Sequence, residues 1–185
     1  MNLTPGEAFL QTAIKRLKYY KSLGDKTFSQ LDPNDFHFTP DAESNSIAVI
    51  IQHIWGNMMS RWTDVLNSDG EKPWRERDLE FVERKLPSAE LLNLWEEGWQ
   101  CFLGALESFK EEDLVKTITI REESLSLIDA INRQLAHYPY HIGQIVFIGK
   151  MIKQAKWRSL SIPKGQSQQY NQSPEIKDPA KKFEK

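Results

Sequence analysis

The chain has 185 residues, which is enough for one globular domain with a sizeable core. Its 24 lysines and arginines nearly balance 26 acidic residues, so the net charge is -2 and no long-range positive field attracts nucleic acid or anionic lipid. No apolar run is long enough to span a membrane, no N-terminal signal pattern is present, and a single cysteine excludes an internal disulfide. These features predict a cytoplasmic protein whose partners include neither nucleic acid nor a membrane.

Two helical patterns occupy the first part of the chain. Thr4, Pro5 and Glu7 read as an N-cap, a first-turn proline and a capping-box acid, and they predict a helix over residues 5–23. Apolar side chains recur at helical spacing again from about residue 45 to 66 and predict a second helix. Turn-forming residues at 67–70 end that pattern.

The second part of the chain begins with a polar connection over residues 71–87. It is longer than most links in helical bundles, so we expect it to cross or cover one end of the bundle. A third helix is predicted to open with Ser88 as its N-cap and to reach about residue 109. Residues 114–120 then alternate in polarity and predict a small β-hairpin with its turn at 122–123. A fourth helix is predicted over about residues 126–153.

Taken together, the four helical segments predict an all-α fold, a four-helix bundle that occupies residues 1–160. Residues 161–185 are rich in Gln, Ser, Pro and Lys and have few side chains able to form a core. They are therefore predicted to form an irregular polar tail.

The histidines are the most informative feature of the sequence. His137 and His141 are four residues apart on the fourth predicted helix, so both imidazoles project from one face. His53 lies in the middle of the second predicted helix, and the three side chains converge if these two helices are neighbours. Three neutral nitrogens with further positions left open suit a catalytic transition-metal site, although each histidine alone is more often a hydrogen-bonded core residue.

Side chains near these histidines are candidates for positioning groups. Asn57 is four residues after His53, and Gln144 is seven residues after His137, so either can hold a bound water or orient a ligand. Tyr140 lies beside His141 and is a candidate proton donor. Pro139 interrupts the backbone hydrogen bonds between the two histidines and predicts a kink there.

Other reactive or exposed side chains receive simpler interpretations. His37 lies in a polar loop and is expected to be solvated. Cys101 lies on an apolar helix face, which is typical of a core thiol rather than a nucleophile. The tryptophans are most simply core and interface residues. Trp55 and Trp62 are seven residues apart on the second helix and are candidates for a face that contacts a partner subunit.

Three segments resemble the DinB-like superfamily, in a branch of uncharacterised proteins: NSIAVIIQHIWGNMMSRWTDVL, DAINRQLAHYPYHIGQIVFIGKMI and WRSLSIPKGQS. The resemblance covers about residues 5–165 and implies up-down-down-up connectivity, with a long link between the second and third helices. It also implies homodimers and a three-histidine metal site, here His53, His137 and His141. Some relatives are thiol S-transferases and others are similar to maleylpyruvate isomerase. Ile142 stands where many relatives have arginine, which argues against an acidic thiol as substrate.

The sequence leaves three hypotheses open. The first is an enzyme with one divalent transition metal per chain, Zn or Ni ahead of Fe, Co and Mn. It activates a thiol or water for attack on a small electrophile, as a thiol S-transferase or a hydrolase, with a low-molecular-weight thiol as candidate substrate. The second is a non-enzymatic metal-binding or stress-associated protein. The third is a helical interaction module in which the histidines are incidental.

Overall fold

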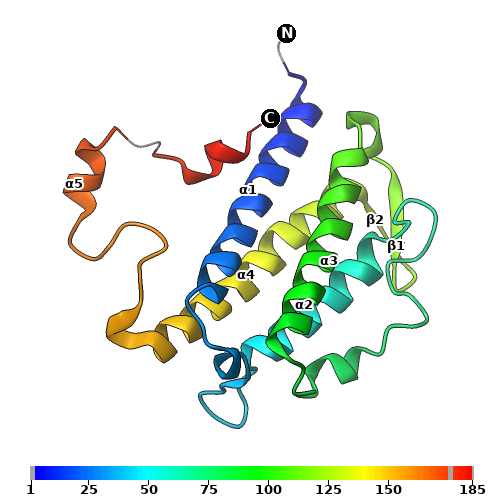
Figure 1. Cartoon of the computed structure of the whole chain (residues 1–185). Helices are drawn as coiled ribbons and strands as arrows, with labels where there is room; N and C mark the ends of the chain where they lie inside the picture. The colour runs from blue at the N-terminus through cyan, green and yellow to red at the C-terminus, as the bar shows by residue number, and fades with distance from the viewer. Residues whose placement is uncertain (1–2, 175–176, 185) are drawn as a thin grey trace.

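A computed structural model describes residues 3–174 and 177–184 of the chain. The protein is mostly helical, with one small antiparallel sheet of two strands. Four long helices lie together, α1 (Pro5–Phe28), α2 (Ile47–Trp62), α3 (Ser88–Ser108) and α4 (Leu127–Lys153) (Figure 1). α2 packs chiefly on α3 and α1 on α4, and α2 also contacts α4. Within the described residues, no helix combines the length and the apolar character that a membrane crossing needs.

Side-chain caps fix the start of three of these helices. Thr4 and Glu7 exchange the two bonds of a capping box at α1, as predicted. The Ser46 hydroxyl accepts a bond from the Val49 amide at the start of α2, and Ser126 caps α4 in the same way. The prediction for α3 was wrong, because Pro87 occupies the N-cap position and Ser88 is the first helical residue.

The predicted helix ends differ from the observed ones where packing overrides the local pattern. α1 continues beyond residue 23 to Phe28, because Thr27 and Phe28 are buried in the core. α2 ends at Trp62, earlier than predicted, because Thr63 is extended and Asp64 has a positive φ of 50°. Val65 is nevertheless buried. The apolar spacing that predicted a longer helix therefore continues into a loop that packs on the core.

The predicted hairpin is present as β1 (Thr117–Ile120) and β2 (Glu123–Ser126). Its turn lies one residue earlier than expected, at Arg121 and Glu122, which have φ values of 55° and 64°. Two central residues with positive φ are typical of a tight hairpin turn whose twist matches that of the strands. The Asp69 carboxylate accepts both turn amides at 2.9 Å and so ties the hairpin to the loop after α2.

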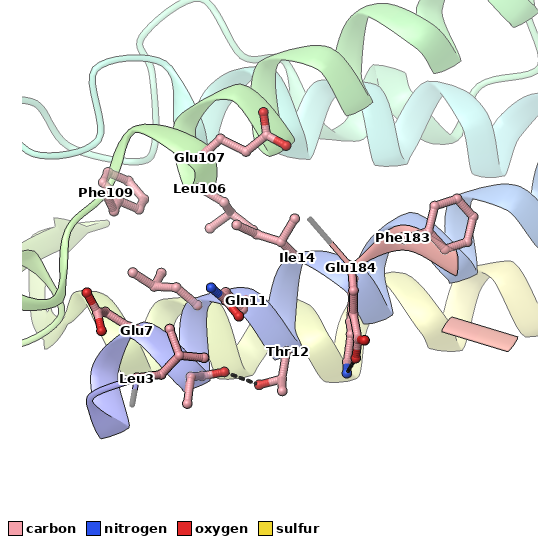
Figure 2. A pocket seen from close by; sticks show the side chains of 13 residues that line it. Leu3, Glu7, Gln11, Thr12, Ile14, Leu106, Glu107, Phe109, Phe183 and Glu184 are labelled. Atoms are coloured by element: carbon pink, nitrogen blue, oxygen red, sulfur yellow. Dashed lines mark hydrogen bonds and ion pairs between the residues drawn. The ribbon is translucent and has the colours of Figure 1, made fainter. Parts of the chain in front are cut away.

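The C-terminal segment, predicted to be irregular over residues 161–185, contains α5 (Ser167–Gln172) and the 3-10 helix η5 (Pro179–Phe183). η5 packs along α1 (Figure 1), where Ala180 is completely buried and Asp178 accepts two bonds from Arg16. Figure 2 shows Phe183 and Glu184 at a cavity of about 450 Å³ that Ile14 of α1 and Leu106 of α3 also line. The end of the chain thus covers part of the first helix.

The remaining short elements are 3-10 helices that connect the main helices. They are η1 (Pro33–His37), η2 (Arg77–Phe81), η3 (Glu111–Asp113) and η4 (Gln154–Lys156). η2 belongs to the long link before α3 and packs on α2. The link therefore covers one helix at a defined place.

Aromatic side chains form the centre of the core. Trp62 is only 3% exposed and its ring lies 4.7 Å from that of Phe102. Its indole N–H donates to the Tyr138 hydroxyl at 3.3 Å. The interpretation of Trp62 as part of a partner-facing surface was wrong, because α3 and α4 cover that side of α2.

We expect Trp62→Ala to lower the free energy of unfolding by about 3–5 kcal/mol, because it leaves a large cavity in the aromatic core. Urea denaturation followed by circular dichroism measures the change. Trp74→Ala is the matched control, because that side chain is 53% exposed and its loss should change stability by only a few tenths of a kcal/mol. Equal losses in the two variants would contradict the core position of Trp62.

Candidate metal centre

The three histidines singled out by the sequence meet between α2 and α4. His53 Nε2 lies 3.3 Å from His137 Nε2, and His141 Nε2 lies 3.0 Å from the same atom. His53 comes from the middle of α2, whereas the other two lie one turn apart on α4. The ligand atoms of all three lie within 4.8 Å of one another. The condition set by the sequence, that the second and fourth helices be neighbours at these positions, is therefore met.

Each imidazole is held at its other nitrogen by an oxygen atom. His53 Nδ1 lies 3.0 Å from the Glu80 carboxylate, which can only accept, so Nδ1 carries the proton. His141 Nδ1 lies 2.8 Å from Gln144 Oε1, and His137 Nδ1 lies 3.4 Å from Gln134 Oε1. In a neutral ring with its proton on Nδ1, the lone pair is on Nε2. All three Nε2 lone pairs then face one point.

Glu80 is the residue that sequence reasoning missed. It is buried, and besides His53 it accepts bonds from Arg75 Nε at 2.7 Å and Arg75 Nη2 at 2.9 Å. Both residues belong to the polar link after α2: Glu80 lies in η2, and Arg75 lies just before it. The length of that link was the only sequence signal, since nothing in its composition distinguishes Glu80 from the four other acidic side chains in residues 71–87.

A glycine in α2 makes room for this carboxylate. Gly56 is one turn after His53, and a Cβ atom at this position would lie 2.3 Å from Glu80 Oε1. Because any other residue carries a Cβ, only glycine lets the carboxylate approach the helix this closely. Gly56 is thus part of what positions Glu80 against His53.

The electrostatics keep the cluster in a form that can bind a cation. Burial lowers the pKa of His137 to about 3, and the neighbouring His141 and His53 add to this effect. Burial also lowers the pKa of His141, against the raising effect of its bond to Gln144. Burial alone would raise the pKa of Glu80, but hydrogen bonds from His53 and Arg75 outweigh it and lower that pKa. At neutral pH the site therefore contains uncharged His137 and His141 beside an ionised Glu80.

These features fit a divalent transition metal. Two nitrogens that share one ion at about 2.0–2.1 Å, in tetrahedral or octahedral geometry, lie roughly 3.0–3.4 Å apart. The two shortest separations in the cluster fall in that range. Metal-ligating histidines usually donate their second N–H to a carboxylate or another oxygen, and each Nδ1 here lies 2.8 to 3.4 Å from such an oxygen.

Of the three positioning groups predicted from the sequence, Asn57 and Tyr140 line the cavity over the histidines and Gln144 does not. The Trp62 indole can only donate to the Tyr138 hydroxyl, so that hydroxyl gives its own proton to Asn57 Oδ1 at 3.0 Å. This leaves the Asn57 amide N–H groups free to act as donors in the cavity that Asn57 lines. Gln144 instead holds His141 from outside, which is the second of the two roles expected for it. Tyr140 is 64% exposed at the cavity, with its ring 5.1 Å from that of His141.

A cavity of about 760 Å³ opens over the histidines. Its walls come from α2, η2, the hairpin turn and α4, and the Phe81 ring lies 4.8 Å from the His53 ring. This volume is in the range of sites that take small molecules. His37, expected to be solvated, lies outside it and is half-buried, with bonds to Glu83 and to the Leu86 carbonyl.

Comparison with known proteins places the chain in a family. Its residues 4–166 match the model of a family described as "Protein of unknown function (DUF1572)", and the chain belongs to that family. Searches of curated proteins and of solved structures found no match. The family description names no activity, so the function has to be argued from the site itself.

We expect Gly56→Ala to break the bond between His53 and Glu80, because the new Cβ takes the space of the carboxylate. Long-range ¹H–¹⁵N NMR spectra of the imidazoles report which nitrogen carries the proton. They should show the His53 proton fixed on Nδ1 in the wild type and distributed over both nitrogens in the variant. Gly104→Ala is the control, because a Cβ there has no atom within 4 Å. An unchanged His53 spectrum in Gly56→Ala would show that Glu80 does not depend on this glycine.

Proposed function

We propose that this protein is an enzyme in which His53, His137 and His141 bind one divalent transition metal and act on a small molecule in the cavity above them. The observation that carries the proposal is the convergence of three Nε2 atoms while each Nδ1 is held by an oxygen. A cluster of incidental histidines would not need three separate oxygen partners on its outer side.

We also propose that the four long helices form the up-down-down-up bundle of the DinB-like superfamily. Contacts of α2 with α3 and of α1 with α4, together with a long link between α2 and α3, support this connectivity. In that arrangement the link crosses the bundle and brings Glu80 to α2. The homodimer and the cytoplasmic location inferred from the sequence stay predictions.

Each residue of the site has a separate task in this proposal. The three histidines bind the metal, and Glu80, Gln134 and Gln144 keep their rings in the orientation and tautomer that binding requires. Arg75 holds Glu80 in place. The Asn57 amide and the Tyr140 hydroxyl face bound substrate as hydrogen-bond donors. A divalent metal supplies Lewis acidity and lowers the pKa of a water or thiol bound in its open position.

Three protein ligands beside an open cavity favour catalysis over a structural role. Structural zinc sites usually have four protein ligands, whereas catalytic sites keep a position open. Within the described residues, the cluster contains only the three histidines, and a cavity of about 760 Å³ adjoins it. We propose Zn or Ni as the metal, and a thiol S-transferase or hydrolase as the reaction class.

We expect about one metal ion per chain in untagged protein, measured by plasma mass spectrometry, and none in His137→Ala/His141→Ala. Thermal unfolding of both proteins shows whether the double variant remains folded. A folded variant without metal supports a catalytic site, whereas a large loss of melting temperature supports the alternative of a metal that only stabilises the protein. Absence of metal in the wild type, after reconstitution with Zn and with Ni, would overturn the proposal.

We expect Glu80→Gln to weaken metal binding about 10–100-fold, because the amide keeps the shape of the side chain but loses the charge that orients His53. Competition with a chromogenic chelator gives the dissociation constant. Glu83→Gln is a matched control. Glu83 lies in the same link as Glu80 and makes a similar 3.0 Å contact with a histidine, His37, but both residues lie outside the site. Equal affinities of Glu80→Gln and Glu83→Gln for the metal would mean that Glu80 does not support the centre.

A further inference from the structure

We infer that the cavity over the three histidines binds a small organic anion, a molecule with a carboxylate or phosphate group, through Arg77 and Arg133. This inference identifies the substrate class of the same site. It rests on the proposed function, because the reaction that follows binding needs the metal centre. The binding of the anion itself depends on the arginines and can be tested separately.

The cavity is strongly basic although the chain as a whole has a net charge of -2. Five arginines are among its lining residues, namely Arg61, Arg75, Arg77, Arg121 and Arg133. No Asp or Glu lines it within the described part of the chain. A concave surface lined by one sign of charge concentrates ligands of the opposite sign.

Carboxylates behind the wall neutralise only some of this charge. Glu80 pairs with Arg75 at 2.7 Å, and Glu71 pairs with Arg61 at 2.8 Å and with Arg121 at 3.0 Å. Five arginines against these two glutamates leave an excess of three positive charges. The side chains of Arg77 and Arg133 form no ion pair or hydrogen bond with any described residue, and both are exposed. Their guanidinium groups are therefore free to take a ligand.

These two arginines flank the histidines from two elements. Arg133 lies one turn before His137 and two turns before His141, so the three side chains share one face of α4. Arg77 is the first residue of η2, the short helix that also contributes Glu80 and Phe81 to the site. A guanidinium group binds a carboxylate or phosphate through two parallel N–H bonds, which is the geometry that an anion between these elements would use.

Two further side chains of the cavity lining offer hydrogen-bond donors. Asn57 uses its carbonyl oxygen to accept from Tyr138, which leaves its amide N–H groups for a ligand. Tyr140 adds an exposed hydroxyl. A ligand rich in acceptor oxygens matches this lining, whereas the unpaired arginines repel a cationic organic ligand.

The same arginines change one interpretation of the sequence. In the sequence, Ile142 argues against an acidic thiol as substrate, because many relatives have arginine there. In the structure Ile142 is only 1% exposed and belongs to the core, so it does not face the cavity. Positive charge reaches the cavity from other elements, and an acidic substrate is therefore compatible with the site.

Isothermal titration calorimetry of the metal-loaded full-length protein tests the inference with three probes at low salt: inorganic phosphate, succinate and the uncharged diamide of succinate. We expect phosphate or succinate to bind and the diamide to bind at least about tenfold more weakly. Arg77→Gln/Arg133→Gln should weaken anion binding about 10–100-fold, because it removes two charge-assisted contacts. Binding should also weaken with rising salt.

Arg84→Gln/Arg158→Gln is the matched control. It removes the same charge from two exposed arginines that do not line this cavity, and it should bind anions like the wild type. Equal anion affinity in the two double variants, binding of the diamide as tight as that of succinate, or no anion binding by the wild type would each overturn the inference.

Metal content, measured on the same samples, separates this inference from the proposed function. If metal binds but anion affinity does not depend on Arg77 and Arg133, the inference alone fails. If anion binding depends on the arginines in a protein that takes up no metal, the metal centre fails and the anion site stands.

Discussion

The arrangement of the site depends on one buried carboxylate, that of Glu80. Removing a carboxylate from water costs several kcal/mol unless charged or hydrogen-bonding partners replace the solvent. Arg75 and His53 supply those partners, and the missing side chain of Gly56 lets the carboxylate reach α2. Because its partners lie on two segments, Glu80 fixes the long link against the helix and fixes one histidine ring at the same time. The positions of Phe81 and Arg77 at the cavity follow from this contact, since both are on η2 with Glu80.

A second carboxylate, Asp69, has a corresponding effect at the hairpin. It accepts the backbone amides of Arg121 and Glu122, whose positive φ angles turn both N–H groups toward it. Hydrogen bonding lowers the pKa of Asp69, so it stays ionised at neutral pH. The hairpin turn is thereby held at the loop after α2, and Arg121 reaches the cavity and Glu71. Segments more than fifty residues apart thus meet in one wall of the site.

The sequence predicts those parts of the molecule that local periodicity determines. The four long helices, the capping box at Thr4 and the hairpin all follow from residue spacing, and they are observed. The convergence of His53 with the pair on α4 also follows, once the two helices are taken as neighbours. Glu80, Arg75 and the basic cavity could not be predicted, because they depend on how an irregular link folds back over α2. Trp62 was misread for a related reason: spacing identifies a helix face but not what covers it.

Charge connects the proposed metal centre with the arginine-lined cavity. Three neutral imidazoles would leave a divalent ion with its full double charge, apart from the single carboxylate that reaches it through His53. The lining adds an excess of three positive charges beyond the pairs that Glu71 and Glu80 form. The ion and the arginines would repel one another. A site that served only to stabilise the fold would gain from anionic ligands or neighbours, because they lower this repulsion. The accumulated positive charge is instead consistent with a substrate that brings the negative charge with it, so that binding neutralises the site only while the substrate is there.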